Sequence, residues 1–354
     1  MTENRKSQKN INQFLGSLIG GAIGDALGWP VEFLTLHEIN RRFGPEGIND
    51  LPRYNGDKAQ ITDDTQMTMF TAEGLLRAES RRINKGICHM PTVIYFAYQR
   101  WLVTQGFTRK EEFGWIYDGW LIDVKALHVS RAPGNSCISA LASERIGIPE
   151  KPINSSKGCG AVMRSAPFGL FLEKDEAYDM AVESAALTHG HPIGFIAAGA
   201  MAYLIAEIIS GVTLEQAVRS TVKKIESVKD GAECAAKLKQ AQRLAWDQVS
   251  DIHAIKAIGE GWIAEEALGI AVYCALRHQI DFKKALIAAV NHDGDSDSTG
   301  SITGNIIGSF IGIEHIPEEW IHAIELKDEL EILAEDLLIG YDERDEWQHK
   351  YPGY

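Results

Sequence analysis

The stretch Gly16-Ser-Leu-Ile-Gly-Gly-Ala-Ile-Gly-Asp-Ala-Leu-Gly28 repeats glycine at every fourth position of an otherwise mostly apolar segment. Residues four apart share one face of an α-helix, so these glycines form a strip that carries no side chains. Such a strip lets a second helix approach closely, which predicts tight helix–helix packing. Phosphate binding is the alternative for a glycine-rich segment. No strand precedes this one, so a dinucleotide-binding βαβ fold is disfavoured.

Helical periodicity continues beyond this stretch, and the alternating runs typical of strands are almost absent. Thr35 with Glu38 and Thr213 with Gln216 have the spacing of capping boxes, and Asp281 can cap a further helix. The segments expected to be helical include Met67–Ala78, Gly194–Ile209, Trp262–Leu276 and Ile321–Leu338. We therefore expect an all-α fold, built as a single compact orthogonal bundle of many helices.

No linker or break in composition divides the chain. We expect residues 1–11 to form a flexible tail and residues 12–354 to form one domain, with the polar segment Tyr341–Tyr354 at its periphery. Two segments, Arg53–Thr65 and Arg131–Arg164, are expected to be loops with functional roles.

The composition restricts the possible partners and compartment. The formal net charge of −14 opposes a general attraction to nucleic acid or to an anionic membrane. The 5 cysteines include no C-x-x-C pair, which disfavours a disulfide framework and a structural zinc site. The uncharged stretch Ser184–Ala206 is long enough to span a membrane. Its first part contains two histidines and a proline, and it therefore indicates a loop followed by a buried helix. With no signal-peptide pattern before Asn10, we expect a cytoplasmic protein.

Two acidic segments contain the candidate metal-binding residues. His292-Asp-Gly-Asp-Ser-Asp-Ser-Thr-Gly300 alternates carboxylates with hydroxyl groups, and its oxygen-only character favours Mg²⁺, Mn²⁺ or Ca²⁺. It is not an EF-hand, because Ser298 replaces the glycine of the sixth loop position and Gly304 replaces the glutamate of the twelfth. A solvated acidic turn that caps the next helix remains the alternative.

The second segment, Ile61-Thr-Asp-Asp-Thr65, directly precedes a helix that we expect to begin near Met67. Helix capping is again the alternative reading. Together the two segments predict a dinuclear metal site, since separated clusters can converge on a pair of cations. Glu32, just beyond the glycine stretch, is a candidate acid or base, or else a surface carboxylate.

Five motifs follow one another along the chain. They are Gly24-Asp25-Ala-Leu-Gly28 with Glu32, Thr62-Asp63-Asp64, Gly158-Cys-Gly-Ala-Val-Met-Arg164, Thr188-His189 and Asp295-Ser-Asp297-Ser298. In this order they resemble the ADP-ribosylglycohydrolase family, over roughly residues 12–340. The segments Arg131–Asn135 and Trp262–Leu268 resemble its bacterial, arginine-directed branch.

The resemblance implies roles for the acidic segments. Thr62, Asp63 and Asp64 on one side, and Asp295, Asp297 and Ser298 on the other, would bind two Mg²⁺ ions, with Mn²⁺ as the alternative cation. Glu32 matches a mobile-loop glutamate, and Glu32, Asp63 and Asp64 are the implied catalytic residues. Asp293 matches no family role.

The resemblance also implies a substrate site. Ser155, Ser156, Gly158, Cys159 and Gly160 match a loop around the diphosphate, with Asn in place of Cys159 in some relatives. His189 matches a histidine near the phosphate or adenosine, or else is a core histidine. Asp123 is a weak candidate for contacting the guanidinium group. Trp262 can stack on adenine or fill the core, and we favour the core.

The implied reaction is hydrolysis of the N-glycosidic bond between ADP-ribose and an arginine side chain of a modified protein. Other linkages, to serine, in O-acetyl-ADP-ribose or in poly-ADP-ribose, are the alternatives within the family. A different class of function is an immunity protein that binds and counteracts a cognate ADP-ribosyltransferase. The intact acidic motifs favour catalysis over a binding role without turnover.

Overall fold

The computed structural model describes residues 10–54, 58–143 and 145–353, and within them no β-strand forms beyond isolated bridges. The elements, in chain order, are α1 (Ile11–Gly28), η2 (Trp29–Val31), α2 (Leu36–Phe43), α3 (Asp63–Lys85), α4 (Met90–Thr104), η3 (Glu111–Ile116), η4 (Leu121–Asp123), η5 (Lys125–Leu127), α5 (Asn135–Ala142), η6 (Cys159–Ala161), α6 (Ala166–Phe171), α7 (Lys174–Ala186), α8 (Pro192–Ile209), α9 (Leu214–Glu226), α10 (Ala232–Trp246), α11 (Asp251–Ile258), α12 (Ala264–Arg277), α13 (Phe282–Val290), α14 (Ser296–Ile311), η7 (Ile313–His315), α15 (Glu318–Ala323), α16 (Lys327–Ile339) and α17 (Asp345–Lys350). The all-α class is confirmed.

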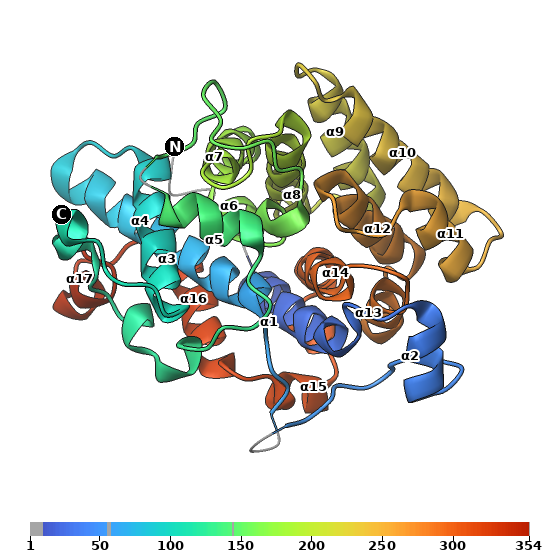
Figure 1. The fold of residues 1–354 in the computed structure, drawn as a ribbon. Coiled ribbons are helices and arrows are strands. Elements are labelled where there is room, and N and C mark those ends of the chain that lie inside the picture. The colour runs from blue at the N-terminus through green and yellow to red at the C-terminus, as the bar shows by residue number, and fades with distance from the viewer. Residues whose placement is uncertain (1–9, 55–57, 144, 354) are drawn as a thin grey trace.

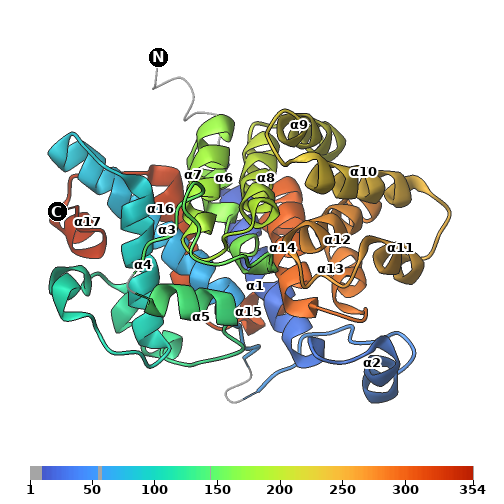
Figure 2. The same ribbon diagram turned by 45° about the horizontal axis from the view of Figure 1, so that its top comes forward.

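Helix α1 and helix α14 lie side by side through the centre of the molecule (Figures 1 and 2). They run antiparallel, because Gly16 faces Gly308 and Gly24 faces Gly300. A Cβ atom on any of these glycines would lie under 3.0 Å from the facing backbone, closer than real Cβ atoms come. The predicted tight packing of the glycine stretch is confirmed, and its partner is the helix that follows the second acidic segment.

Polar contacts add to this backbone contact in the buried interface. Asn305 donates its side-chain amide to the Ser17 carbonyl at 2.8 Å, and the Ser17 hydroxyl donates to the Asn305 carbonyl at 3.2 Å. Near the C-terminal end of α1, a Cβ on Gly28 would meet the backbone of Ser296 and Asp297. The antiparallel arrangement therefore brings the end of α1 against the start of α14.

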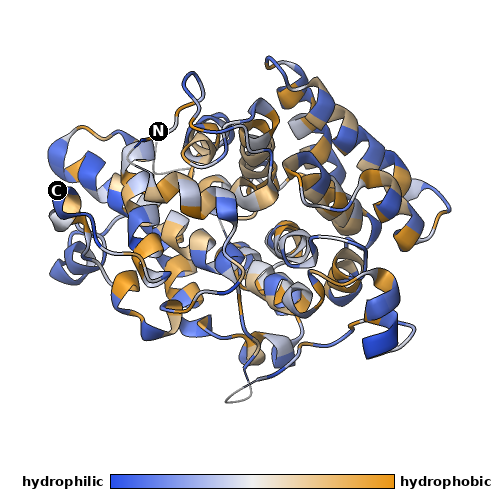
Figure 3. Cartoon of the chain, viewed as in Figure 1, coloured by the Kyte–Doolittle hydropathy of each residue, from blue (hydrophilic) through white to orange (hydrophobic). Residues whose placement is uncertain are grey.

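The other helices enclose this pair. One continuous apolar cluster extends from Phe14 in α1 to Tyr351 after α17. Hydrophilic residues gather on outer helices such as α2 (Figure 3). Two helical segments, Ile11–Val31 and Pro192–Ile209, are long and apolar enough to cross a membrane by length and composition, but both are mostly buried in the protein, as core helices are.

Several local expectations can be compared with the structure. Both capping boxes, at Thr35 and Thr213, are present, and Asp281 caps α13. The helix expected near Met67 begins earlier, at Asp63, so the first acidic segment forms the N-cap and first turn of α3.

The expectation that Tyr341–Tyr354 is peripheral is wrong for its apolar residues. Trp347 and Tyr351 are buried, and the Trp347 indole donates to Ser80 at 3.0 Å, because the segment packs back onto α3. Of the tail expected at residues 1–11, residues 1–9 lie outside the described residues, while Ile11 already belongs to α1.

The glycine contact predicts the effect of adding one methyl group. Gly304→Ala places a Cβ against the backbone of Gly20, which cannot move without separating the two central helices. We expect the free energy of unfolding to fall by about 3 kcal/mol. Gly114→Ala is the matched control, because nothing lies within 4 Å of its Cβ position; it should change stability by less than about 0.5 kcal/mol. Equal stability of the two variants in urea titrations would contradict the close contact.

Candidate functional site

The first acidic segment is shaped by the start of α3. Thr62 is the N-cap, and its hydroxyl accepts a hydrogen bond from the Asp64 backbone at 3.3 Å. Asp63 and Asp64 form the first turn, and both are buried. Their carboxylates therefore lie at the positive end of a 23-residue helix, where negative charge is stabilised.

The second acidic segment is shaped in the same way by the start of α14. Asp295 is the N-cap, and Asp297 and Ser298 lie in the first turn. The Asp295 backbone donates to the Glu260 carbonyl at 2.9 Å, which holds the preceding loop in place. A Cβ on Gly294 would collide with that same carbonyl, so the turn requires glycine there.

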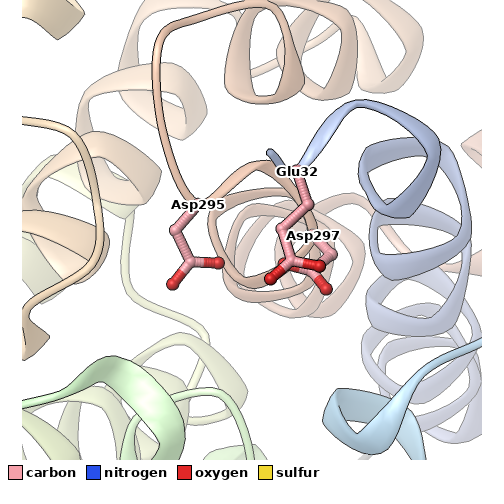
Figure 4. A group of neighbouring side chains, drawn as sticks. All are labelled: Glu32, Asp295 and Asp297. Atoms are coloured by element: carbon pink, nitrogen blue, oxygen red, sulfur yellow. The ribbon is translucent and has the colours of Figure 1, made fainter. Parts of the chain in front are cut away.

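The two segments meet. Ser298 donates to the Asp64 carboxylate at 3.4 Å, although the two residues are 234 positions apart in sequence. Glu32, from the loop after η2, joins Asp295 and Asp297, and carboxylate oxygens of the three lie within 4.8 Å of one another. Figure 4 shows the carboxylates of Glu32 and Asp297 against each other, with Asp295 turned toward them. The predicted convergence of the separated clusters is present in the structure.

Burial makes this arrangement unfavourable for charged carboxylates alone. It is the largest cause of the raised pKa of Glu32, to about 8, with the Asp295 and Asp63 charges adding to it. Burial also raises the pKa of Asp63 to about 8 and holds the pKa values of Asp64 and Asp297 well above their ordinary range. These carboxyl groups need either protons or cations to be stable together.

The donor set fits a divalent metal. Oε2 of Glu32 and Oδ1 of Asp64 are buried, and no described residue donates a hydrogen bond to either. Of the alternative reading, a solvated acidic turn that caps the next helix, the capping is present because Asp295 caps α14, but the turn is buried and not solvated. The converging atoms are carboxylate and hydroxyl oxygens, which suit hard cations such as Mg²⁺.

Cys159 lies beside this cluster. Its thiol donates to Oδ2 of Asp295 at 2.7 Å, and it also lies 3.5 Å from the Ser298 hydroxyl. Burial, followed by the Asp295 charge, raises the pKa of the thiol well above its usual range, so the group stays protonated. The side chain thus contacts the acidic cluster, and a protonated thiol is a poor nucleophile.

The loop expected to bind the diphosphate lies next to the cluster through Cys159. Ser155 is exposed, while Ser156, Gly158 and Gly160 are half-buried. Some of its donors are already used: the Gly158 N–H donates to the Ser156 hydroxyl at 3.4 Å, and the Cys159 N–H donates to the Trp262 carbonyl at 3.3 Å. The N–H groups of Gly158 and Cys159 are therefore not free to bind a phosphate in this conformation.

His189 packs directly against this loop. Cβ atoms built on Gly158 and Gly160 would each lie 3.4 Å from its Nε2 atom. Burial and the nearby Arg164 charge lower the pKa of His189 to about 3, so the ring is neutral. Arg164 donates to the Thr188 hydroxyl at 2.6 Å, and that hydroxyl lies 2.8 Å from Nδ1 of His189 and 3.4 Å from the Ala185 carbonyl. The other ring nitrogen, Nε2, faces the loop.

The segment Arg131–Asn135 wraps around the first cluster. The Asp63 N–H donates to the Arg131 carbonyl at 3.3 Å, and the Gly134 N–H donates to the Asp63 carboxylate at 3.1 Å. Ala132 between them has a positive φ of 49°, a conformation that costs a non-glycine residue energy. Arg131 itself pairs with Glu325.

Two further candidate residues, Asp123 and Trp262, lie at exposed positions. Asp123 is exposed in η4, and within the described residues it forms no hydrogen bond or ion pair with the acidic cluster. Trp262 was expected in the core, which is wrong: it is 38% exposed and stacks on Phe33, which is 74% exposed, with ring centroids 5.7 Å apart. The stack joins the Glu32 loop to the segment before α12.

Comparison with known proteins agrees with this geometry. The sequence profile described as ADP-ribosylglycohydrolase matches residues 6–346. The chain belongs to the ADP-ribosylglycohydrolase family. Its class of activity, hydrolysis of ADP-ribosyl groups carried by proteins, follows from that membership, and the resemblance seen in the ordered motifs is confirmed.

Individual relatives cover nearly the whole chain. ADP-ribosyl-[dinitrogen reductase] glycohydrolase of Rhodospirillum rubrum is 26% identical, over 90% of this chain and 92% of its own. ADP-ribosylhydrolase ARH3 of Mus musculus is 28% identical over 93% and 92%. ADP-ribosylarginine hydrolase Tri1 of Serratia proteamaculans is 23% identical over 95% and 82%. A solved structure titled ADP-ribosylglycohydrolase-related protein complex shares the fold, with a TM-score of 0.66 at 23% identity, covering 93% of this chain and 98% of that one.

Sequence reasoning missed Asp25 as part of this glycohydrolase site. It lies within the quoted glycine stretch, and the structure shows it buried beneath Thr62, whose hydroxyl and backbone both donate to it. An aspartate in a helix otherwise made of apolar and small residues is a signal for such a role, because a buried carboxylate needs donors.

The raised pKa values predict how this family member responds to pH. Without metal, the folded protein keeps protons on Glu32 and Asp63 up to a pKa of about 8, whereas the unfolded chain releases them near their ordinary values of 4.5 and 3.8. The folded state therefore binds more protons over that interval, and the free energy of unfolding should fall as pH rises from about 4 to about 8.

Mg²⁺ competes with those protons, so the increase in Tm on adding Mg²⁺ should be larger at pH 8 than at pH 6. Glu32→Gln is the control, because it removes one titrating group and should flatten the pH dependence of the metal-free protein. Thermal melts over this range, with Mg²⁺ and with EDTA, measure both effects. An Mg²⁺-induced increase in Tm that does not change with pH would contradict the proton–cation competition.

Proposed function

We propose that this protein is a Mg²⁺-dependent hydrolase that releases ADP-ribose from ADP-ribosylated arginine side chains, with Mn²⁺ as the alternative cation. The observation that carries the proposal is the meeting of two distant acidic segments with Glu32 in one buried cluster, in a chain of the ADP-ribosylglycohydrolase family.

The residues that would hold the cations come from two helix N-termini. Thr62, Asp63 and Asp64 would bind from α3, and Asp295, Asp297 and Ser298 from α14. When bound, the two cations would balance the charges of the four aspartates, leave that of Glu32, and polarise oxygen atoms of the ribose and of water. The unpartnered acceptors on Glu32 and Asp64 support this assignment.

The reaction exchanges one bond at ribose C1. The bond from C1 to the guanidinium nitrogen breaks, the hydroxyl of a water molecule is added to C1, and the proton of that water passes to the departing nitrogen. Glu32 is proposed to take the proton from water and deliver it, with Asp63 and Asp64 as the alternative carboxylates. Positive charge develops at C1 as the nitrogen leaves, and the surrounding carboxylates favour that charge.

The ADP part would lie over the loop Ser155–Gly160. Nε2 of the neutral His189 faces this loop, and in the tautomer that carries the proton on Nε2 it can donate a hydrogen bond to a phosphate oxygen without adding charge. The position of His189 therefore favours the substrate role over a purely structural role in the core.

Three considerations support arginine as the linkage. One relative, 23% identical over 95% of this chain, is named an ADP-ribosylarginine hydrolase. The segment Arg131–Asn135, which resembles that branch, lies directly on Asp63. A guanidinium group keeps its positive charge and is favoured next to a carboxylate cluster, whereas serine and O-acetyl linkages leave through neutral oxygen.

The competing function is that of an immunity protein, which would bind a cognate ADP-ribosyltransferase without turnover. Such a role does not require buried carboxylates without partners, because these destabilise the folded state unless they bind a ligand. Release of ADP-ribose by the purified protein distinguishes the two functions.

Removing one ligand tests the site directly. Asp297→Ala should lower kcat by at least about 100-fold, since metal affinity depends on each ligand, yet the protein should remain folded because the change relieves repulsion among buried carboxylates. Asp175→Ala, which removes an exposed carboxylate paired with Lys224, is the matched control and should leave kcat unchanged. Turnover of Asp297→Ala equal to that of the control at saturating Mg²⁺ would refute the assignment.

The linkage is tested with two matched peptides, one ADP-ribosylated on arginine and one on serine. We expect faster release of ADP-ribose from the arginine peptide, for the electrostatic reason given above, when kcat/KM is compared under the same Mg²⁺ concentration. Equal or faster release from the serine peptide would overturn the arginine assignment and leave the metal assignment intact.

A further inference from the structure

Asp25 is a buried carboxylate that contacts neither solvent nor the predicted substrate loop. It has 0% exposure and lies in the last turns of α1. Its Oδ1 accepts from the Thr62 hydroxyl at 2.9 Å, and its Oδ2 accepts from the Thr62 N–H at 2.9 Å. Oδ2 also accepts from the Thr65 N–H at 3.1 Å and from the Thr65 hydroxyl at 2.5 Å. The Asp25 side chain thus accepts hydrogen bonds from both the N–H and the hydroxyl of Thr62, the N-cap of α3, and of Thr65 in its first turn.

These hydrogen bonds determine the orientation of the Thr62 hydroxyl group. An ionised carboxylate accepts only, so the Thr62 hydroxyl must donate its proton to Asp25. The same oxygen accepts from the Asp64 N–H at 3.3 Å. The Thr62 hydroxyl oxygen then keeps one free lone pair, whose direction is fixed by the hydrogen bonds to Asp25 and from Asp64. Asp25 therefore orients the Thr62 hydroxyl oxygen, the side-chain atom with which Thr62 could bind a cation.

Asp25 also connects the two acidic segments. It follows Gly24, which contacts the backbone of Gly300, and precedes Gly28, which contacts the backbone of Ser296. Since neither contact leaves space for even a Cβ atom, the end of α1 and the start of α14 cannot shift relative to each other. The hydrogen bonds from Asp25 then fix the start of α3 to the same frame.

We propose that Asp25 is a positioning residue that sets the spacing between the cation ligands of α3 and those of α14. The inference rests on the proposed metal-dependent function, and it adds a residue that touches neither the cations nor the substrate. Its role is to hold Thr62, Asp63 and Asp64 at the separation from Asp295 and Asp297 that a pair of cations requires.

The test is the variant Asp25→Asn, in which one oxygen becomes an amide that cannot accept from Thr62 or Thr65. We expect the Mn²⁺ concentration for half-maximal binding, measured by titration calorimetry without substrate, to rise at least about 10-fold. The Mg²⁺ concentration for half-maximal activity should rise in parallel. Thr65→Val, which removes one donor and leaves Asp25 in place, should give a smaller rise in both.

Asp336→Asn is the matched control. Asp336 is also buried, 7% exposed, and accepts hydrogen bonds from Tyr351 and Lys350 far from the acidic segments. A general loss of stability would affect this variant as well, whereas a positioning role predicts an unchanged Mn²⁺ affinity in Asp336→Asn.

The outcomes separate this inference from the proposed function. Mn²⁺ affinity of folded Asp25→Asn equal to that of wild type, or lowered equally in Asp336→Asn, would overturn the positioning role. If Asp25→Asn does not fold, Thr65→Val decides, and an unchanged Mn²⁺ affinity overturns the role. If wild type binds Mn²⁺ and Asp25→Asn binds it weakly, but neither releases ADP-ribose, the positioning role stands and the proposed activity fails. If wild type binds no Mn²⁺, both fail.

Discussion

The backbone contact between α1 and α14 is the constraint on which the site depends. Gly16, Gly20 and Gly24 lie against Gly308, Gly304 and Gly300, with no space for side chains between them. Close contact over this length buries backbone atoms and gives each helix a fixed register against the other. Because the helices are antiparallel, the same register places the end of α1 and the loop carrying Glu32 beside the first turn of α14. The packing along these two helices thereby determines which carboxylates meet.

The acidic cluster is stable only as part of this rigid frame. Helix N-termini offset some of the negative charge on Asp63, Asp64 and Asp297, but burial still raises their pKa values. The folded protein therefore holds carboxyl groups in an arrangement that favours cations or protons over free charges. The ligands are therefore preorganised, and metal binding does not require them to move. The hydrogen bonds of Asp25 extend the same rigidity to α3.

Much of this could be predicted from sequence, because short motifs report local chemistry. The glycine spacing predicted tight helix packing, the hydroxyl–carboxylate segments predicted an oxygen-rich cluster, and the order of the motifs indicated the family. The partner of the glycine helix could not be predicted, since any small-residue face would suit it. The prediction that Trp262 lies in the core was wrong, because an aromatic side chain fits a core and an exposed stack equally well. The role of Asp25 depends on contacts with Thr62 and Thr65, which lie 37 and 40 positions away and leave no periodic signal.

The central claim is that two distant segments hold one pair of cations. Anomalous scattering from Mn²⁺-soaked crystals tests it most directly, because the peaks locate the ions without any assumption about activity. We expect two peaks, separated by about 4 Å as in other two-metal sites, one bounded by Asp63 and Asp64 and the other by Asp295 and Asp297. No peak between these carboxylates in a well-ordered crystal, or a single peak bound by only one of the two segments, would contradict the account.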